Sequence, residues 1–353
     1  MSYEYERVVS PAAGLRLHLN ENTAGCSPAV LGVLQALTRQ DAAFYPDYDV
    51  AIAACAGRLG VAPDRVLLTN GLDEGILALS VAALRGSSLD APFEVIVVVP
   101  AFDMYAACAD AVGGRVVEVP LGGDLTFRAA PVLDAIGPRT RLIWLTNPNN
   151  PTGQLVPREA ILRIADAAPR AIVAVDEAYA DFSGESLLEE PTLDRCRNIV
   201  VGRTFAKVYG LAALRAGALV AHPTTLAPMR RVVLPYSINV ATAVALPAAL
   251  ADREYYDWYL GEVRESKSLL YGAFDRLGLQ YWTSAANFVL ARVENGTPGS
   301  GRRVVDRLAA RGVYVRDKSR DPGCAGCIRV TAGVVADTRQ FIRTLEEVLC
   351  ERR

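Results

Sequence analysis

The chain has 353 residues, of which 51% are hydrophobic and 22% are charged, and its formal net charge is −2. This length and composition predict two domains of unequal size, each with its own hydrophobic core. A net charge so close to zero gives no reason to expect binding to nucleic acid or to an anionic membrane surface.

The N-terminus and the cysteines indicate where the protein resides. The first seven residues contain no apolar stretch after a basic start, so no secretory signal is expected. No apolar run reaches the ~18 residues that are needed to cross a bilayer. Seven cysteines, an odd number, favour reduced thiols and a cytoplasmic protein. Cys324 and Cys327 form a single C-x-x-C with no second pair, so a zinc site is not expected.

The first third of the chain begins with an irregular arm over residues 1–29. Ser27 followed by Pro28 predicts a helix start, with serine as the N-cap and proline in the first turn, and the helix is expected to reach Leu37. Tyr45 lies in a loop whose exposed aromatic residues are unusual. A second helix is expected over 50–59.

Strands and helices then alternate. Short β-branched runs predict seven strands, at 65–69, 95–99, 115–119, 142–146, 172–175, 199–201 and 216–220. Amphipathic segments predict helices at 73–84, 104–112, 131–135 and 158–167. Most of the strands are almost continuously apolar, as strands buried on both faces are. The expected fold is therefore α/β, with an open, mostly parallel sheet covered by helices on both sides.

The pattern changes after residue 240. A long helical run covers 240–277, with Pro247 expected to interrupt it. Short strands are expected at 288–292, 313–315 and 328–331, and helices at 301–311 and 337–349. This predicts a smaller α+β domain over 241–353, which follows a large domain over 30–240.

The carboxyl ends of the strands are where sheets of this kind bind ligands. After the first strand, Gly71 allows a close turn, and the backbone of Leu72 and Asp73 starts a helix whose N-terminus can bind an anion. Phe102, after the second strand, is placed either to lie on a flat ligand or to pack in the core. Residues 147–153, Asn-Pro-Asn-Asn-Pro-Thr-Gly, form a rigid loop that is rich in amide donors and includes Asn150.

Two further strand ends carry charged groups. Asp176 directly follows a buried strand and needs a cationic partner, either a structural arginine or the protonated ring nitrogen of a pyridine cofactor. Lys207 is one of only three lysines, and it lies among apolar residues, whereas Lys267 and Lys318 lie among polar ones, as solvated lysines do. Burial of an amine lowers its pKa and prepares it to attack a carbonyl. The alternative is a lysine that reaches solvent from a helix edge.

The histidines are expected to play no part in this chemistry. His18 lies in an alternating apolar stretch and His222 ends one, so both are interpreted as structural. The remaining groups are an anion site, an aromatic ring, an amide, a buried acid, a tyrosine, an amine and an arginine. These are the contacts that pyridoxal 5′-phosphate requires.

Three ordered motifs carry a family resemblance. They are residues 147–153, residues 176–179 (Asp-Glu-Ala-Tyr) and residues 203–207 (Arg-Thr-Phe-Ala-Lys) followed by Arg215. In this order and spacing the chain resembles the fold-type-I pyridoxal-phosphate aminotransferases of class I/II, whose large domain is aspartate-aminotransferase-like. Among these it is most similar to the histidinol-phosphate aminotransferase family. The resemblance extends from Asn20 to Gly333 and so covers nearly the whole chain.

The resemblance implies the role of each site residue. Lys207 binds the cofactor covalently and moves the substrate proton, while Asp176 pairs with the pyridinium nitrogen. Asn150 and Tyr179 hydrogen-bond the phenolic oxygen of the ring, on which Phe102 stacks. The residues that hold the cofactor phosphate are Gly71, Leu72, Asp73, Thr204 and Arg215, with Tyr45 reaching it from the partner subunit of a homodimer. On the substrate side are Asn22, Arg329 for an α-carboxylate, and Arg316 for the phosphate of histidinol phosphate.

The chain departs from the family pattern at three places. Ala206 replaces a common serine, which removes one phosphate hydrogen bond. Leu72 replaces a small residue in the phosphate turn. Ser10-Pro11-Ala12 stands where relatives have a tyrosine near the substrate, which weakens the substrate prediction and leaves the cofactor prediction intact.

The expected activity is amino transfer between histidinol phosphate and 2-oxoglutarate. Two alternatives use the same cofactor residues: an aminotransferase for aromatic or pathway-specific amino donors, and a decarboxylase related to threonine-phosphate decarboxylase. A regulator that senses pyridoxal phosphate would need a DNA-binding domain, and none is expected in this chain.

Overall fold

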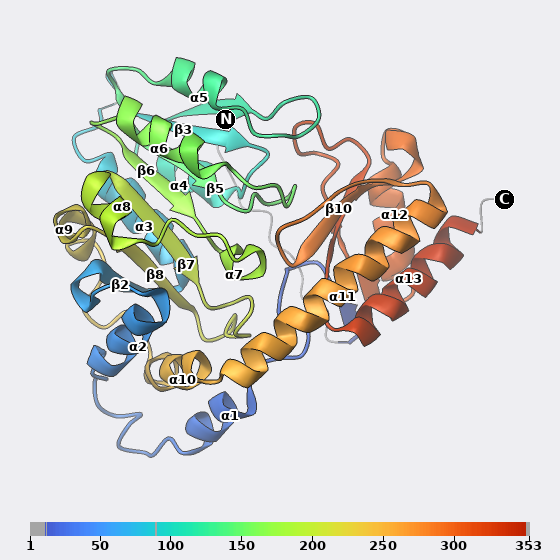
Figure 1. Cartoon of the computed structure of the whole chain (residues 1–353), viewed down its shortest axis with the longest axis horizontal. Helices are drawn as coiled ribbons and strands as arrows, with labels where there is room; N and C mark the ends of the chain where they lie inside the picture. Colours follow the sequence, from blue (N-terminus) through green and yellow to red (C-terminus); the bar gives the residue numbers. More distant parts are fainter. Residues whose placement is uncertain (1–10, 12, 89, 351–353) are drawn as a thin grey trace.

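The computed structural model describes residues 11, 13–88 and 90–350 of the chain. Ser10 and Ala12, which belong to the segment where the family resemblance led us to expect a tyrosine, lie outside the described residues. The chain folds into a large part built on a seven-stranded sheet and a smaller part that includes the C-terminal helices (Figure 1). The long helix α11 (Arg253–Leu277) runs from one part to the other.

The large sheet has the strand order β2-β8-β7-β6-β5-β3-β4. Its strands are β2 (Val66–Asn70), β3 (Glu94–Val99), β4 (Arg115–Pro120), β5 (Thr140–Thr146), β6 (Ile172–Asp176), β7 (Ile199–Thr204) and β8 (Ala216–Ala221). All pairings are parallel except the two that β8 makes with β2 and β7. The prediction of a mostly parallel seven-stranded sheet in an α/β fold is confirmed.

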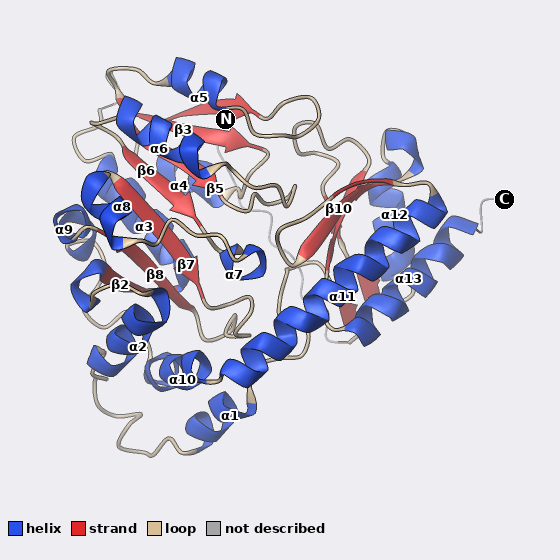
Figure 2. Ribbon diagram, in the orientation of Figure 1, coloured by secondary structure: helices blue, strands red, loops and turns tan. Residues whose placement is uncertain are grey.

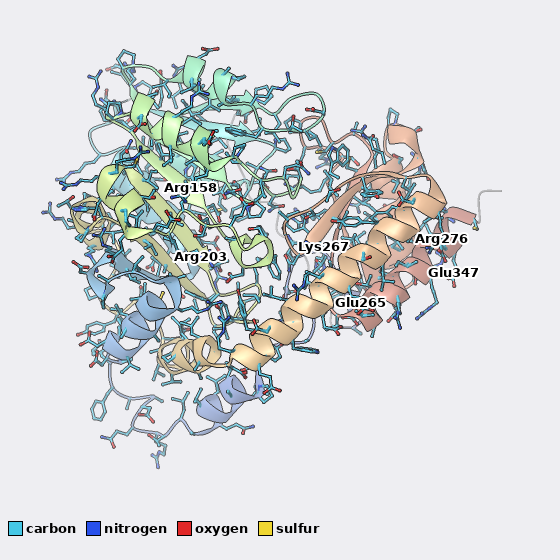
Figure 3. All side chains as sticks on the ribbon, viewed as in Figure 1. Arg158, Arg203, Glu265, Lys267, Arg276 and Glu347 are labelled. Carbon is cyan, nitrogen blue, oxygen red and sulfur yellow. The ribbon has the colours of Figure 1, made fainter. Side chains whose placement is uncertain are left out.

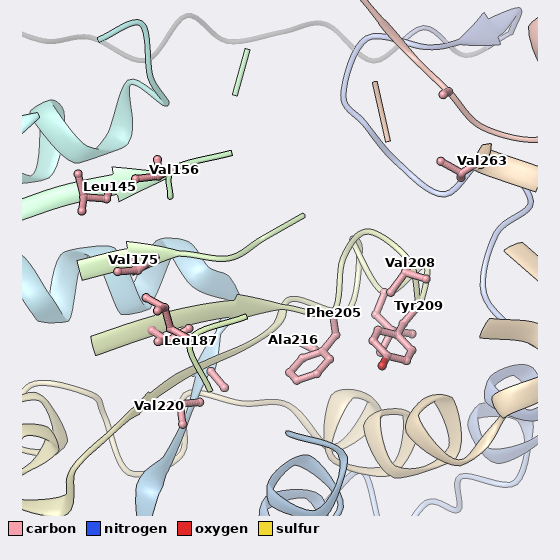
Figure 4. Packing of buried hydrophobic residues seen from close by; sticks show 14 of the residues in the cluster. Leu145, Val156, Val175, Leu187, Phe205, Val208, Tyr209, Ala216, Val220 and Val263 are labelled. Carbon is pink, nitrogen blue, oxygen red and sulfur yellow. The ribbon is translucent and has the colours of Figure 1, made fainter. Parts of the chain in front are cut away.

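Helices cover both faces of this sheet, as the apolar strands predicted (Figure 2). Leu142 and Trp144 of β5 face a core shared with α3 (Gly71–Ala83), α4 (Met104–Ala111) and α9 (Pro223–Arg230). The alternate residues Ile143 and Leu145 face a second core, because successive side chains point to opposite faces of a strand. Figure 4 shows part of this second core, where Leu145, Val156 and Val175 lie together.

The second core is covered by helices from several parts of the chain. They are α1 (Pro28–Gln35), α2 (Asp49–Leu59), α5 (Ala129–Ala135), α6 (Arg158–Ala167), α8 (Glu190–Arg195) and α10 (Val240–Ala251). Residues of α10, which the sequence assigned to the small domain, pack against α1 and α2. The domain boundaries at 29/30 and 240/241 stay a prediction.

The smaller part contains a four-stranded antiparallel sheet with the order β12-β13-β10-β9. Its strands are β9 (Gln280–Trp282), β10 (Phe288–Arg292), β12 (Arg316–Asp317) and β13 (Cys327–Thr331), and it packs with α11, α12 (Ser300–Ala309) and α13 (Val335–Cys350). β1 (Leu15–Arg16) pairs in parallel with β11 (Val313–Tyr314), so the N-terminal arm is tied to this part of the molecule.

The predicted interruption of the long helix was wrong in its position. Pro247 lies inside α10, and the break comes at Asp252, between α10 and α11. The Asp252 carboxylate accepts a hydrogen bond from the backbone N–H of Tyr255 at 3.0 Å and so caps α11. None of the described helices is both long and apolar enough to span a membrane.

Candidate active site

A cavity of about 300 Å³ lies at the carboxyl ends of the central strands, where the two parts of the chain meet. β6 ends in it with Asp176, and β7 ends in it with Thr204. The site residues predicted from sequence that line it are Leu72, Asp73, Phe102, Asn150, Asp176, Tyr179, Thr204, Lys207, Arg215, Arg316 and Arg329. Residues separated by more than 250 positions in the chain therefore meet in one cavity.

Lys207 lies in this cavity on the loop after β7. Its Nζ donates a hydrogen bond to the Leu19 carbonyl at 3.1 Å and lies 5.7 Å from the centre of the Tyr179 ring. The other two lysines differ from prediction. Lys318 lines the same cavity, and Lys267 is part-buried, donating to the Ser284 carbonyl at 2.8 Å. Burial lowers the pKa of Lys267 to about 8, but this residue on α11 is not part of the cavity lining (Figure 3).

Asp176 is buried beside the cavity, and among the described residues no cation lies within ion-pair distance of it, although the charge of Lys207 acts on it from farther away. Its carboxylate accepts hydrogen bonds from the Tyr105 hydroxyl and, at 2.8 Å, from the backbone N–H of Ala178. Burial raises its pKa to about 6, although both hydrogen bonds act in the opposite direction. Tyr105, which sequence reasoning missed, is itself held against Trp144, with stacked rings 4.4 Å apart.

Arg203, on the strand next to Asp176, is not the structural arginine that could have paired with it. Arg203 pairs with Glu177 at 3.2 Å and with Asp181 at 2.9 Å, and all three side chains are buried. Figure 3 shows Arg203 in the large part of the molecule. Asp176 forms no ion pair with any described residue, so the pyridine interpretation of this acid is the one that the geometry favours.

An anion site lies at the N-terminus of α3. Gly71 has a positive φ of 73°, and its N–H donates to the Arg215 carbonyl at 2.6 Å. The Arg215 guanidinium packs so closely over Gly71 that a Cβ at this position would overlap it. Arg215 also pairs with Asp73 at 2.6 Å. The first backbone N–H groups of a helix have no partners within the helix, so they and Arg215 can bind a phosphate together.

The two departures in this region leave the anion site intact. The Leu72 side chain packs against Gly202 and Gly75 in the core, so only its backbone is needed at the turn. Ala206 lines the cavity with a methyl group, where the family resemblance led us to expect a hydroxyl. Its N–H donates to the Thr204 hydroxyl at 3.2 Å, which holds Thr204 in the turn.

Two arginines from the small sheet line the same cavity. Arg316 on β12 and Arg329 on β13 are direct cross-strand partners, so their side chains lie on the same face. Arg329 is buried and donates to Asn150 and, at 2.8 Å, to the His18 carbonyl. Both arginines line the cavity, so they place positive charge on this side of it.

Some predicted contacts are arranged differently. Tyr179 accepts a hydrogen bond from Asn20 at 3.0 Å, and Asn20 lines the cavity although it was not predicted. Asn22, which was predicted on the substrate side, lies outside the cavity lining. Its amide donates to the Val208 carbonyl at 2.9 Å and accepts from the Ala24 N–H at 3.0 Å, so it fastens the arm to the Lys207 loop.

Tyr45 is also absent from the cavity of its own chain. It is 77% exposed and stacks on Tyr236, with ring centres 4.1 Å apart. His18, interpreted as structural from sequence, is buried and lines the cavity. Among the described residues, no group of histidine, cysteine, aspartate and glutamate side chains is placed to hold a metal ion.

Comparisons with known proteins agree with this geometry. A family model described as aminotransferase class I and II matches residues 13–345. A histidinol-phosphate aminotransferase from Moorella thermoacetica is 34% identical over 98% of this chain and 88% of its own length. The crystal structure of histidinol-phosphate aminotransferase from Sinorhizobium meliloti in complex with pyridoxal-5′-phosphate has a TM-score of 0.85 and 26% identity, covering 97% of this chain and 92% of that one.

The fold is shared more widely. Aspartate aminotransferase from Thermus thermophilus, with maleate, matches at a TM-score of 0.80 and 22% identity, over 95% of this chain and 92% of that chain. This likeness confirms the predicted aspartate-aminotransferase-like fold of the large domain.

Proposed function

Because the chain belongs to the aminotransferase class I and II family, we propose that it transfers the amino group of histidinol phosphate to 2-oxoglutarate. Its cofactor is pyridoxal 5′-phosphate. The substrate proposal is supported by the named relatives and by the cross-strand pair Arg316 and Arg329, which faces the cavity.

The residues present fit this cofactor. Asp176 is a buried carboxylate without an ion-pair partner among the described residues, which suits a protonated ring nitrogen. Gly71 and Arg215 form a phosphate cradle that a Cβ would fill. Lys207 places an amine in the same cavity, and Phe102 and Tyr179 provide aromatic surface. Asp176, with no cation of its own, is the single observation that most favours pyridoxal phosphate over another phosphorylated ligand.

Each residue then has a chemical task. Bound pyridoxal phosphate supplies an electron-poor ring that stabilises negative charge at the Cα of a bound amine. Asp176 stabilises the positive charge on the ring nitrogen, and Tyr105 orients Asp176. Lys207 takes the Cα proton of the amino donor through its Nζ. Asn20 holds the Tyr179 hydroxyl, which would hydrogen-bond the phenolic oxygen of the cofactor. Arg215 and the N-terminus of α3 bind the phosphate.

Substrate recognition falls to the small part of the chain. Arg329, fixed by Asn150 and by the His18 carbonyl, binds the α-carboxylate of 2-oxoglutarate or glutamate as a two-pronged donor. Histidinol phosphate has no carboxylate and ends in a phosphate dianion, for which Arg316 is the second cation. One cavity can therefore take both substrates in turn.

The active form is proposed to be a homodimer. Tyr45 and Tyr236 are exposed and stack on each other, with ring centres 4.1 Å apart. Four other large apolar side chains are also more than half exposed: Leu31, Phe44, Val50 and Leu234. Ser237, next to Tyr236 in the sequence, donates to Glu74 in the first turn of α3 at 3.0 Å, which ties the stacked tyrosines to the helix assigned to the phosphate. A second copy that covers the exposed tyrosines would bring its own Tyr45 to the phosphate. The seven cysteines, none in a disulfide in the described chain, support a cytoplasmic location.

The test is to compare the wild type with Arg316→Ala on histidinol phosphate and on phenylalanine, each with 2-oxoglutarate. Contacts to a charged group are worth roughly 1.5–3 kcal/mol, so kcat/KM for histidinol phosphate should fall about ten- to a hundredfold, with a small loss for phenylalanine. Arg276→Ala, an exposed arginine on α11 (Figure 3), is the matched control and should change neither value. Equal losses on both donors would favour the aromatic or pathway-specific alternative.

A further inference from the structure

His18 combines deep burial with a lack of hydrogen-bond partners. Its side chain is only 4% exposed, and neither Nδ1 nor Nε2 has a hydrogen-bond partner in the described part of the chain. The residue follows β1 and lines both the cavity of about 300 Å³ and the adjoining cleft of about 730 Å³. A buried polar side chain without a partner is costly, so histidines in a packed core are normally hydrogen-bonded. This one faces a space that a ligand can enter.

The fold fixes His18 in place through its backbone and its ring. Its carbonyl accepts a hydrogen bond from Arg329 at 2.8 Å, and its ring lies 6.2 Å from the Tyr314 ring in a tilted arrangement. The charged groups that act on the ring are Glu21, Arg16, Arg316 and Arg329. Burial is the largest influence and lowers the pKa of the imidazole, whose neutral form still offers one donor and one acceptor.

The neighbours of His18 indicate the charge of the missing partner. Arg316 and Arg329 face the same cavity, and Lys318 lines it beside them, paired with Asp321 at 2.6 Å. The ligand group that best fits this position is an anion with several acceptor oxygens. One of its oxygens can accept the imidazole N–H of His18, and another can accept a hydrogen bond from Arg316. A phosphate monoester has three such oxygens and carries close to two negative charges at neutral pH.

We propose that His18 is a specificity-determining residue that hydrogen-bonds the terminal phosphate of the amino donor together with Arg316. This inference rests on the proposed function and deepens it, because it assigns a second protein group to the phosphate end of the substrate. Arg329 then serves the oxo acid, while His18 and Arg316 serve the phosphate. His18 takes no part in proton transfer at Cα, which belongs to Lys207.

A binding experiment without turnover tests the contact itself. The chain has only two histidines, so the cofactor-loaded enzyme labelled with ¹⁵N-histidine gives two imidazoles, which His222→Gln assigns. The probe is 3-(imidazol-4-yl)propyl phosphate, which lacks the amine and cannot react, and its unphosphorylated alcohol is the control. The His18 signals should shift on saturation with the phosphate ester and not with the alcohol. His222, which caps α9, should not respond to either.

Kinetics test specificity. His18→Leu should lower kcat/KM for histidinol phosphate about ten- to a hundredfold, and lower that for histidinol or phenylalanine less than threefold. His18→Gln, which keeps a side-chain N–H, should recover part of the loss on the phosphate ester. His222→Gln should leave all values unchanged. Equal losses on phosphorylated and unphosphorylated donors, or an unshifted His18 signal with the ester bound, would overturn the inference.

Failure of the proposed function looks different. If wild-type enzyme transfers no amino group from histidinol phosphate, the proposed substrate is wrong. The imidazole signals then still decide whether His18 contacts a phosphate ester. A shift of the His18 signals with the bound ester supports a phosphate contact that serves another phosphorylated donor, and the absence of a shift overturns the inference.

Discussion

Gly71→Ala should separate the phosphate cradle from the rest of the fold. Gly71 has φ of 73°, a conformation that costs other residues about 1–2 kcal/mol. In addition, the new Cβ would overlap the Arg215 guanidinium and displace it from the phosphate end of the cavity. A lost contact between Arg215 and the cofactor phosphate is worth roughly 1.5–3 kcal/mol. The cofactor Kd of the variant should therefore rise about ten- to a hundredfold.

Gly113 offers a matched control. It has a similar φ of 77°, and a Cβ there would have no atom within 4 Å. Gly113→Ala should lower the free energy of unfolding of the cofactor-free protein by about 1–2 kcal/mol and leave the cofactor Kd unchanged. Urea unfolding measures the first quantity, and titration of cofactor absorbance measures the second. If Gly71→Ala bound the cofactor as tightly as Gly113→Ala does, the assignment of Arg215 and the Gly71 turn to the phosphate would be refuted.

Three other perturbations address the remaining parts of the site. The Lys207→Ala protein should lose turnover but still bind the cofactor non-covalently, and Lys267→Ala should stay active. If the Lys207→Ala protein kept the yellow absorbance band that the covalently bound cofactor gives in the wild type, this role of Lys207 would be contradicted. Asp176 has a pKa raised from 3.8 to about 6 in the cofactor-free protein, so its ionisation opposes folding as pH rises between these values. The unfolding free energy of Asp176→Asn, relative to that of the wild type, should therefore rise by about 2 kcal/mol between pH 4 and pH 7. A difference that does not change with pH would show that the pKa of Asp176 is not raised in the folded protein. Mixing Lys207→Ala with Tyr45→Phe should give hybrid dimers with one intact site, whose activity exceeds the sum of the parents; exchange of subunits without such a gain would exclude shared sites.

The fold was largely predictable because its signals are local. The strands of the large sheet are short, β-branched runs buried on both faces, and each of the seven was found within a few residues of its predicted position. The helix break was not predictable from proline alone. Pro247 is accommodated within α10, and Asp252, an ordinary polar residue by sequence, caps the next helix.

The site residues that lie in a motif at the end of a strand were predictable. The site residues that packing brings in from distant segments were not. Asp176 and Thr204 end buried strands and Lys207 follows one, so their meeting at one edge of the sheet results from the topology. Tyr105 has no such signal, since its contact with Asp176 depends on how α4 packs on the sheet. His18 enters the cavity because β1 pairs with β11 of the small part. Lys318 enters it because β12, which it follows, pairs with β13, and no local pattern indicates either pairing.

The most direct test of amino transfer follows the nitrogen itself. Wild-type enzyme is incubated with histidinol phosphate labelled with ¹⁵N at the amine and with unlabelled 2-oxoglutarate, and the glutamate formed is analysed by mass spectrometry. A parallel incubation with carboxyl-labelled amino acid phosphates monitors released carbon dioxide. Amino transfer predicts ¹⁵N-glutamate in equal amount to the histidinol phosphate consumed, and no carbon dioxide. Carbon dioxide released from an amino acid phosphate, without ¹⁵N in glutamate, would contradict it and indicate a decarboxylase.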